Sequence, residues 1–437
     1  MNPLEYVAGA IADWDHYLIL LLVSAVLHWL LLLRTRTLGF FDPLFFILLG
    51  SVFGWAIVWF MFLRGDIAGV YAASFTVTEL AFCAGLYAAG RPGNVPETRT
   101  AIGEPAGFAI AVFIAAAGMH IASTLTMWAL VGIPLFQVSR LGAFVGSGGL
   151  GILERLSDAG GPIALFSALY LAMGNARTRR RFAYYGFFFW YTVASGLSGS
   201  KSGLLVIGQC VFAVAFLFTD LGRRDASYWG GRLGKVFIGV ATAFAVLVML
   251  VQQDADLPTA VVGLAYRMVA FGDIYVYAYP DATIEHLQGD NPLVGLFGGF
   301  LSTFRLLPVE QIHTNIGYQF TLLTFPDIDY IAGPNPRHPV FGYHYFGPFA
   351  FAFSFILGLL TVWVQRSLYF PAKRDYLHTL IAYVMYTALV TISVDFDYSM
   401  SRLASMLIGL CFVLMPALLL FPGQTLFWLP RRSRAVR

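Results

Sequence analysis

Long apolar runs recur along almost the whole of this 437-residue chain, and they restrict its fold more than any other feature. Hydrophobic residues make up 58% of the chain and charged residues only 12%, a composition outside that of soluble globular proteins. A helix needs about 20 apolar residues to cross the hydrocarbon core of a bilayer. We therefore predict an all-α, polytopic integral membrane protein.

The apolar runs predict about eleven transmembrane helices, of which the fifth to the seventh are short. Between the eighth and the ninth lies a stretch of 93 residues without a run of membrane length. The chain then divides into helices 1 to 8 over 1–252 with a short outer loop at 134–161, a long loop at 253–345, and helices 9 to 11 with a basic tail over 346–437. The predicted spans are 16–33, 43–63, 68–90, 106–133, 162–176, 182–198, 203–220, 233–252, 346–365, 376–394 and 403–421.

The distribution of Lys and Arg over the loops predicts the orientation. Of the 27 cations, nineteen lie on the side of the C-terminus and eight on the other side. Because positive residues concentrate in cytoplasmic loops, we predict a cytoplasmic C-terminus, with the N-terminus and the 253–345 loop on the outer side, which in the inner membrane of a bacterium is the periplasm. The net charge of +3 then reflects topology and does not indicate nucleic acid as a partner. The eight outer cations are candidates for binding an anion.

Cysteine and metal-ligand patterns predict neither a disulfide nor a cofactor. Cys83, Cys210 and Cys411 each fall inside an apolar run, where they act as small hydrophobic residues. No zinc spacing or redox motif is present, and no group of ligands has a spacing suited to a metal ion. We therefore expect chemistry without a metal.

Glu79 and His120 lie at the middle of the third and fourth predicted spans. A charge at that depth costs about 2.5–3.5 kcal/mol on insertion scales. The two spans run antiparallel, so the side chains are expected at similar depth and can satisfy each other. The alternatives are hydrogen bonds to nearby Thr and Ser side chains, or a proton relay.

The 253–345 loop is the expected working part of the protein, because a structureless connection of this length is uncommon without a function. It has eight of the twenty prolines and nine acidic residues. Its histidines are His286, His313, His338 and His344, and its only cations are Arg267, Arg305 and Arg337.

Three groups of outer residues combine side chains that chemistry can use. Arg267 and Asp273 are followed by Tyr275, Tyr277 and Tyr279, which form either an interfacial aromatic belt or a surface for sugar rings. The Gly333–Gly347 segment places Arg337 beside His338 and His344 on a path fixed by proline and glycine. The third group consists of Asp395, Asp397 and Arg402, which either bind a sugar hydroxyl or neutralise one another.

Lys201 lies in a Ser-Gly-Ser-Lys-Ser turn that formally matches the Ser-x-x-Lys of acyl-transfer enzymes. The companion motifs of those enzymes are missing, so Lys201 is better interpreted as a point charge for a phosphate. Outer arginines, aromatic strips and scattered Asp, Glu and His suit a substrate with a lipid tail, a diphosphate and a sugar. Arginine holds phosphates, and a carboxylate or imidazole accepts the proton of an attacking hydroxyl.

At these residues the chain resembles the Wzy-type O-antigen polymerases, which are related to the O-antigen ligases within the GT-C glycosyltransferases. The resemblance rests on the number of spans, the Ser198–Gly203 turn, Arg267 with Gly272 and Asp273, and the Gly333-Pro-Asn-Pro-Arg run that leads to Phe346-Gly347-Pro348 and Gly358. The chain differs in that 134–161 is much shorter than 253–345. His344 is similar to the histidine that ligases place before a late glycine-bearing span.

The resemblance implies an enzyme that joins undecaprenyl-diphosphate-linked repeat units at the periplasmic face, with lipid-linked donor and acceptor as substrates. It implies that Arg267, Arg305, Arg337 and Lys201 hold the diphosphate, and that His344 or Asp273 acts as the base. Sugar-binding roles then go to Arg402, His338, His313 and Tyr275. A chain-length regulator is a possible partner. The rivals are an O-antigen ligase that delivers glycan to lipid A core, and a flippase or carrier without catalysis.

Overall fold

The computed structural model describes most of the chain as helices joined by short turns. Within the described residues every regular element is a helix, which confirms the predicted all-α class. The described ranges are 3–90, 107–136, 151–173, 178–198, 203–218, 273–289, 291–327, 333–369 and 375–421, with single positions between 239 and 257.

Seven helical stretches are long and apolar enough to cross a membrane, which supports a multi-pass membrane protein. They are Trp14–Arg36, Pro43–Arg64, Gly69–Ala88, Gly107–Phe136, Gly151–Met173, Arg337–Tyr369 and Phe396–Leu420. Within Arg337–Tyr369 the chain reverses direction at Gly347, so the part of membrane length is Ala350–Tyr369. The predicted span at 233–252 falls almost wholly outside the described residues, so the count of eleven stays a prediction.

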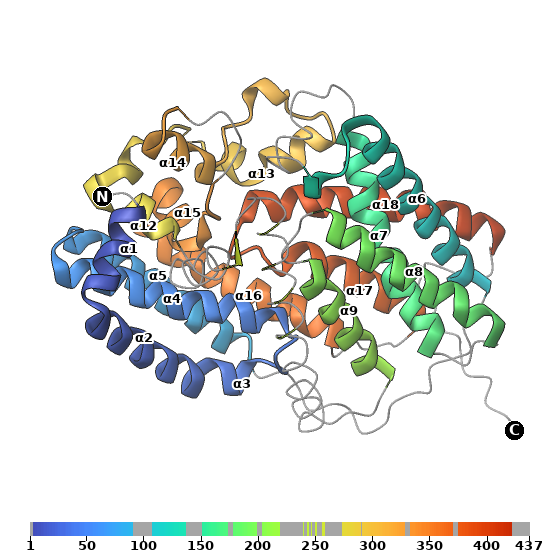
Figure 1. Ribbon diagram of the computed structural model, residues 1–437, viewed down its shortest axis with the longest axis horizontal. Coiled ribbons are helices and arrows are strands. Elements are labelled where there is room, and N and C mark those ends of the chain that lie inside the picture. The colour runs from blue at the N-terminus through green and yellow to red at the C-terminus, as the bar shows by residue number, and fades with distance from the viewer. Residues whose placement is uncertain are drawn as a thin grey trace, which may run out of the picture.

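The helices of the bundle carry the labels of Figure 1. Trp14–Arg36 consists of α2 (Trp14–His28), a π-helical turn η1 (Trp29–Leu33) and α3 (Arg34–Arg36), and it follows the short α1 (Pro3–Ala12). The others are α4 (Pro43–Arg64), α5 (Gly69–Ala88), α6 (Gly107–Val131) with the short η2 (Pro134–Phe136), α7 (Gly151–Met173), α8 (Thr178–Leu197), α9 (Gly203–Phe218), α16 (Ala350–Tyr369), α17 (Tyr376–Leu389) and α18 (Phe396–Leu420).

Helix α7 begins at Gly151, inside the stretch predicted as the outer loop 134–161. The prediction placed its start at residue 162 because Glu154, Arg155 and Asp158 interrupt the apolar run. In the structure these charges occupy the first two turns of the helix.

The described part of the predicted long loop is largely helical, and we call residues 273–346 the cap. In Figure 1 α12, α13, α14 and the N-terminus lie along the top and upper left, away from the C-terminus. Asn291 and Asn315 begin α13 and α14 by accepting backbone N–H groups with their side chains. The cap helices are α12 (Ile274–Ala278), η4 (Pro280–His286), α13 (Pro292–Thr303), η5 (Val309–Gln311), α14 (Ile316–Thr324) and α15 (Arg337–Phe346).

The chain reverses direction between α15 and α16. Helix α15 therefore begins inside the bundle and runs outward to the turn, and α16 runs back alongside it. Gly347 has φ 51° and ψ −121°, a conformation that favours glycine. His338 Nδ1 lies 3.0 Å from Ser354 Oγ, whereas residues sixteen apart in one straight helix would be about 24 Å apart. A Cβ at Gly342 would lie 3.1 Å from the Ala350 Cβ. The two helices therefore pack antiparallel, and α15 starts beside the middle of α5.

A helix that starts inside a bundle needs acceptors for its first amides. The backbone N–H groups of Arg337 and His338 donate to the carbonyl oxygens of Val394 and Ser393, at 2.8 and 2.9 Å. These carbonyls belong to the turn between α17 and α18. The start of α15 is thus fixed by the turn between α17 and α18.

Helix α16 is held against α5 by a close approach of two glycines. A Cβ at Gly85 would overlap the Phe355 carbonyl oxygen, and one at Gly358 would overlap the Phe82 carbonyl oxygen. Small residues allow this kind of backbone contact in membrane helices. The contact places the α15–α16 hairpin at a fixed depth along α5.

We predict that Gly85→Ala lowers the melting temperature in detergent, because its methyl group forces the two backbones apart at a cost of about 1–3 kcal/mol. Gly118→Ala in α6 is the matched control, since a Cβ there meets nothing within 4 Å. Equal melting temperatures for the two variants would contradict the glycine contact.

Candidate functional site

A buried group of charges, which we call the Glu79 cluster, links the cap to the bundle. Glu79 lies midway along α5 and is 1% exposed. His338 Nε2 is 3.6 Å from Glu79 Oε1, and the Arg337 guanidinium and Ser51 also interact with this carboxylate. Neither oxygen of the Glu79 carboxylate has a hydrogen bond among the described residues. Its charge is therefore stabilised mainly by the electrostatic attraction of Arg337.

Arg337 and His338 reach Glu79 because the start of α15 is tightly seated. The Arg337 guanidinium lies against Gly50 of α4, where any Cβ would overlap it. The His338 ring stacks on Phe82 with centroids 4.6 Å apart. Arg337 itself has φ 48°, a strained conformation for a residue with a side chain. Both side chains are over 90% buried, which suits positioning of α15 rather than direct contact with a substrate.

A second group, the α7–α18 cluster, consists of Glu154, Arg155, Asp158 and Arg402. Asp158 interacts electrostatically with Arg402 and Arg155, and Arg155 Nη1 donates to Ser405 Oγ at 3.2 Å. All four charges lie in the first two turns of their helices. Asp158 is exposed, although α7 is contacted by α6, α8, α9, α17 and α18. Asp158 is thus the exposed member of the cluster, while Glu154, Arg155 and Arg402 are half-buried.

Sequence reasoning named Arg402 but missed its partners on α7. The usable signal was the spacing of Glu154 and Asp158, which are four residues apart and therefore share one face of a helix. The alternative in which Asp395 and Asp397 neutralise Arg402 is not what the described contacts show. Asp158 is the carboxylate that interacts with this arginine.

Asp395 and Asp397 have structural partners instead. The Asp395 side chain begins α18 by accepting the Tyr398 amide at 3.0 Å, and Asp397 Oδ1 accepts the Gly299 amide of α13 at 3.0 Å. Burial raises the pKa of the Asp395 carboxyl to about 7, while the Tyr398 amide acts in the opposite direction. These contacts tie α13 over the start of α18, next to the α7–α18 cluster.

His120 pairs with α7 and not with Glu79, so the alternative in which Glu79 and His120 satisfy each other is wrong. His120 Nδ1 lies 3.0 Å from the Ser157 carbonyl oxygen and 3.2 Å from Ser157 Oγ. Thr124 Oγ1 is 2.8 Å from the same hydroxyl. The reason is the helix arrangement, in which α5 packs mainly on α16 and α6 mainly on α7.

His344 and His313 meet at Gly289 in the cap. His344 Nε2 lies 3.1 Å from the Gly289 carbonyl oxygen. A carbonyl only accepts, so Nε2 carries the hydrogen and Nδ1 is the basic nitrogen of the neutral ring. Gly289 has φ 87°, and a Cβ there would overlap the His313 ring.

The remaining predicted site residues are scattered. Tyr275 is buried in α12 against Gly54 and lies near Arg337. Asp273 is half-buried directly before α12, and Arg305 is exposed in the turn after α13. Arg267 and Lys201 lie outside the described residues. The structure thus brings Arg337, His338 and Tyr275 together, and separately His344 with His313.

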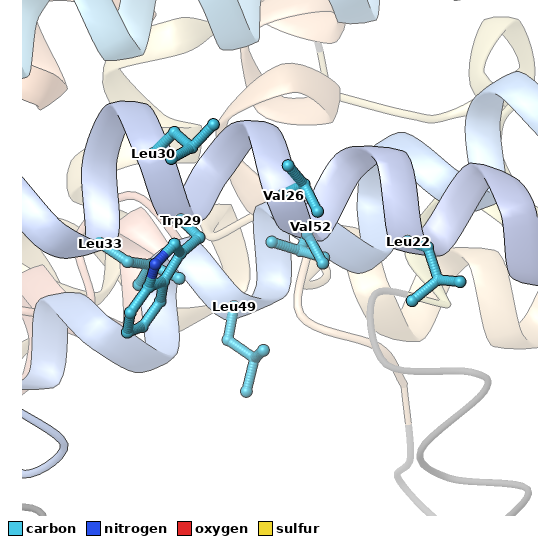
Figure 2. A pocket seen from close by; sticks show the side chains of 8 residues that line it. Leu22, Val26, Trp29, Leu30, Leu33, Leu49 and Val52 are labelled. Atoms are coloured by element: carbon cyan, nitrogen blue, oxygen red, sulfur yellow. The ribbon is translucent and has the colours of Figure 1, made fainter.

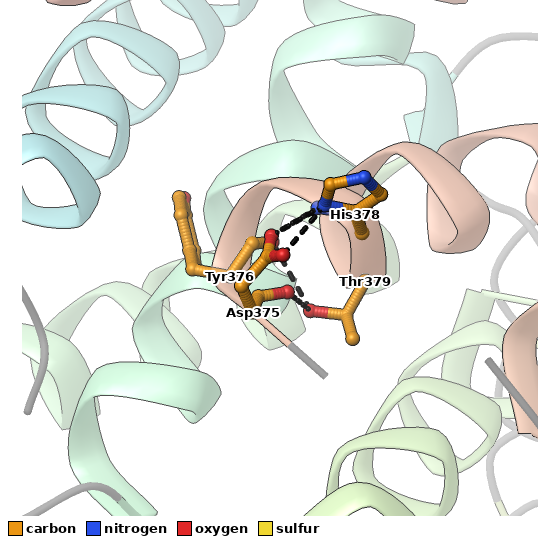
Figure 3. A network of polar contacts seen from close by, with 4 residues as sticks. All are labelled: Asp375, Tyr376, His378 and Thr379. Atoms are coloured by element: carbon orange, nitrogen blue, oxygen red, sulfur yellow. Dashed lines mark hydrogen bonds and ion pairs between the residues drawn. The ribbon is translucent and has the colours of Figure 1, made fainter. Parts of the chain in front are cut away.

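Two further features do not form reactive sites. An apolar groove of about 360 Å³ lies between the α2–η1 stretch and α4 and suits lipid chains. Figure 2 shows residues that line it, such as Leu22, Trp29 and Leu49. Figure 3 shows Asp375 at the start of α17, where it accepts the His378 amide at 2.9 Å and contacts the His378 ring at 2.6 Å. This is a helix cap.

No metal-binding group of three or more ligands occurs among the described residues.

No family model, curated protein sequence or solved structure matches this chain. Function is therefore inferred from the residues and their geometry.

We predict that Glu79→Gln lowers thermal stability, because it removes the negative charge that attracts the buried Arg337 guanidinium, at a cost of up to about 3–5 kcal/mol. The double variant Glu79→Gln with Arg337→Met should recover part of that loss, since the buried positive charge is removed as well. Melting temperatures in detergent measure both. A double variant less stable than either single variant would contradict the pairing.

Proposed function

We propose that this chain is a metal-independent membrane glycosyltransferase that polymerises undecaprenyl-diphosphate-linked oligosaccharide repeat units at the periplasmic face of the bacterial inner membrane. The observation that carries the proposal is the α7–α18 cluster. Two guanidinium groups and two carboxylates lie where two spanning helices begin, beneath the contact of α13 with α18.

In this reaction the acceptor hydroxyl attacks the anomeric carbon of the donor glycan. A new C–O bond forms, and the bond from that carbon to the diphosphate oxygen breaks. Arg155 and Arg402 hold the diphosphate and stabilise the negative charge that develops as it leaves. Arginine suits this role because its planar donors match phosphate oxygens.

The hydroxyl proton goes to a base, for which two groups are candidates. Asp158 is accessible and interacts with both arginines, so it lies where the reaction would take place. His344 has its Nδ1 as the basic nitrogen, on the cap. We favour Asp158, because proximity to the reacting atoms comes first in general base catalysis. Asp273 stays a weaker candidate.

The cations that the sequence predicted to hold the diphosphate have other roles in this proposal. Arg337 positions α15 through Glu79, because its guanidinium is buried. Arg305 is exposed on the cap and is suited to attracting an anionic substrate. Roles for Arg267 and Lys201 stay predictions. His338 and Tyr275, both buried beside Arg337, support the cap.

The start of α15 inside the bundle favours a second candidate, a carrier of lipid-linked oligosaccharide. Helices that begin near the bilayer midplane bind anions in many transporters. Here, however, the amides of Arg337 and His338 are occupied by Val394 and Ser393. The enzyme is therefore the better-supported function, and a ligase with the same donor chemistry differs only in its acceptor.

The proposal predicts that purified protein lengthens undecaprenyl-diphosphate-linked repeat units without an added cofactor. Arg402→Ala should lower the turnover rate about 10²- to 10³-fold, as expected for a lost group that stabilises developing charge. Arg402→Lys should keep part of the activity, since it retains the charge. Products are measured by their length distribution on a gel.

Arg64→Ala is the control, because Arg64 pairs with Asp66 at 3.1 Å at the end of α4. It should leave turnover unchanged. Wild-type protein that moves lipid-linked oligosaccharide across vesicles and never lengthens it would overturn the enzyme in favour of the carrier. In cells, loss of a polymerase leaves single repeat units on lipid A core, whereas loss of a ligase leaves none.

A further inference from the structure

The carboxylate of Glu285 is held in place on the cap by two phenols. Its Oε1 accepts hydrogen bonds from the Tyr343 hydroxyl at 2.8 Å and the Tyr71 hydroxyl at 3.3 Å. Both bonds use the same oxygen. Among the described residues Oε2 has no hydrogen bond, and no cation pairs with this exposed carboxylate. A fixed acceptor oxygen therefore faces solvent.

The two tyrosines that bond this carboxylate pack against each other, and a third tyrosine stacks on one of them. The rings of Tyr71 and Tyr279 stack at 5.5 Å with an interplanar angle of 8°, and Tyr343 meets Tyr71 edge-on at 5.7 Å. Tyr71 and Tyr279 are buried, while Tyr343 is half-exposed. The buried pair thus supports one accessible ring beside one accessible carboxylate oxygen.

We infer that Glu285 and Tyr343 form a subsite for an uncharged sugar residue of the lipid-linked acceptor, an inference that rests on the proposed function. Glu285 Oε2 accepts a hydrogen bond from a sugar hydroxyl, and the Tyr343 ring packs against the apolar face of the pyranose. Hydrogen bonds to a charged group are stronger than those between neutral groups, so this contact orients the sugar.

The same geometry selects against other ligands. A carboxylate without a neighbouring cation repels acidic sugars such as uronates. An aromatic cage for an organic cation needs several accessible rings, whereas Tyr71 and Tyr279 are buried and, of the three tyrosines described at this carboxylate, Tyr343 alone is partly accessible. The subsite therefore favours a neutral, hydroxyl-rich ring.

The test compares Glu285→Gln, Tyr343→Phe and Tyr343→Ala in the full-length purified protein. Glu310→Gln is the control, since Glu310 is an exposed cap carboxylate in η5. With lipid-linked repeat units as substrate, Glu285→Gln and Tyr343→Ala should each raise KM for the acceptor about ten-fold with kcat within about two-fold, the pattern of lost ground-state binding. Tyr343→Phe keeps the ring and should have a smaller effect.

A second readout separates this inference from the proposed function. Saturation-transfer NMR uses the soluble repeat-unit oligosaccharide released by mild acid from the lipid-linked precursor of the host. Wild-type protein should transfer saturation to it, and Glu285→Gln and Tyr343→Ala should lose most of that transfer at unchanged melting temperature.

If the NMR signal is lost in these variants but wild-type protein makes no polymer, the subsite stands and the glycosyltransferase proposal fails. If wild-type protein makes polymer and both variants keep KM and NMR signal within two-fold of wild type, the subsite is overturned and the proposed function stands.

Discussion

A carboxylate in the middle of a membrane-spanning helix needs a positive or hydrogen-bonding group close to it. The groups that lie close to Glu79 determine how the cap is arranged. The partners do not come from a neighbouring span. They are Arg337 and His338, at the start of α15. To bring Arg337 and His338 to this depth, the chain enters the bundle before residue 337. Helix α15 then runs outward, the chain turns at Gly347, and α16 runs inward again.

This solution creates a second requirement, which other parts of the bundle meet. A helix start inside the protein exposes N–H groups, and the turn between α17 and α18 supplies their acceptors. The Arg337 guanidinium fits against α4 because Gly50 has no side chain at that position. The Glu79 cluster thus joins α4, α5, α15 and the α17–α18 turn, so it fixes the cap with respect to the bundle.

With the cap fixed, polar chemistry concentrates where α13 and α15 meet the bundle. The α7–α18 cluster lies in the first turns of its two helices, next to the turn of α18 that Asp397 ties to α13. The groove of Figure 2, between the Trp14–Arg36 stretch and α4, is by contrast lined by apolar side chains. This separation suits a substrate whose lipid tail stays in the bilayer while its charged and sugar parts reach the cap.

The sequence predicted the helices well, because a long apolar run in a membrane has few alternatives to a helix. Ten of the eleven predicted spans overlap described helices, and the misplaced start of α7 arose from the charges at Glu154, Arg155 and Asp158.

Tertiary neighbours were harder to predict than helices. Equal depth suggested a Glu79–His120 contact, but the order of helices along the chain does not fix which of them touch. The reversal at Gly347 was missed because the polar residues of α15 resemble a loop, and only contacts distant in sequence reveal a re-entrant helix. The interaction of Arg402 with Asp158 was missed because these residues are also distant in sequence.

The most direct test of this account is a cysteine cross-link between residues 342 and 350, in protein whose three native cysteines are replaced by serine. The account predicts that Gly342→Cys with Ala350→Cys forms an intramolecular disulfide on mild oxidation. A Cβ added at 342 would lie 3.1 Å from the Ala350 Cβ, so a small shift of the two helices gives the usual disulfide separation of about 3.5–4.5 Å. A control pair eight residues apart within α16, Phe351→Cys with Leu359→Cys, lies about 12 Å apart along the helix and should not react. Absence of the first disulfide under conditions that oxidise other buried cysteine pairs would contradict the antiparallel contact of α15 with α16, and with it the placement of Arg337 beside Glu79.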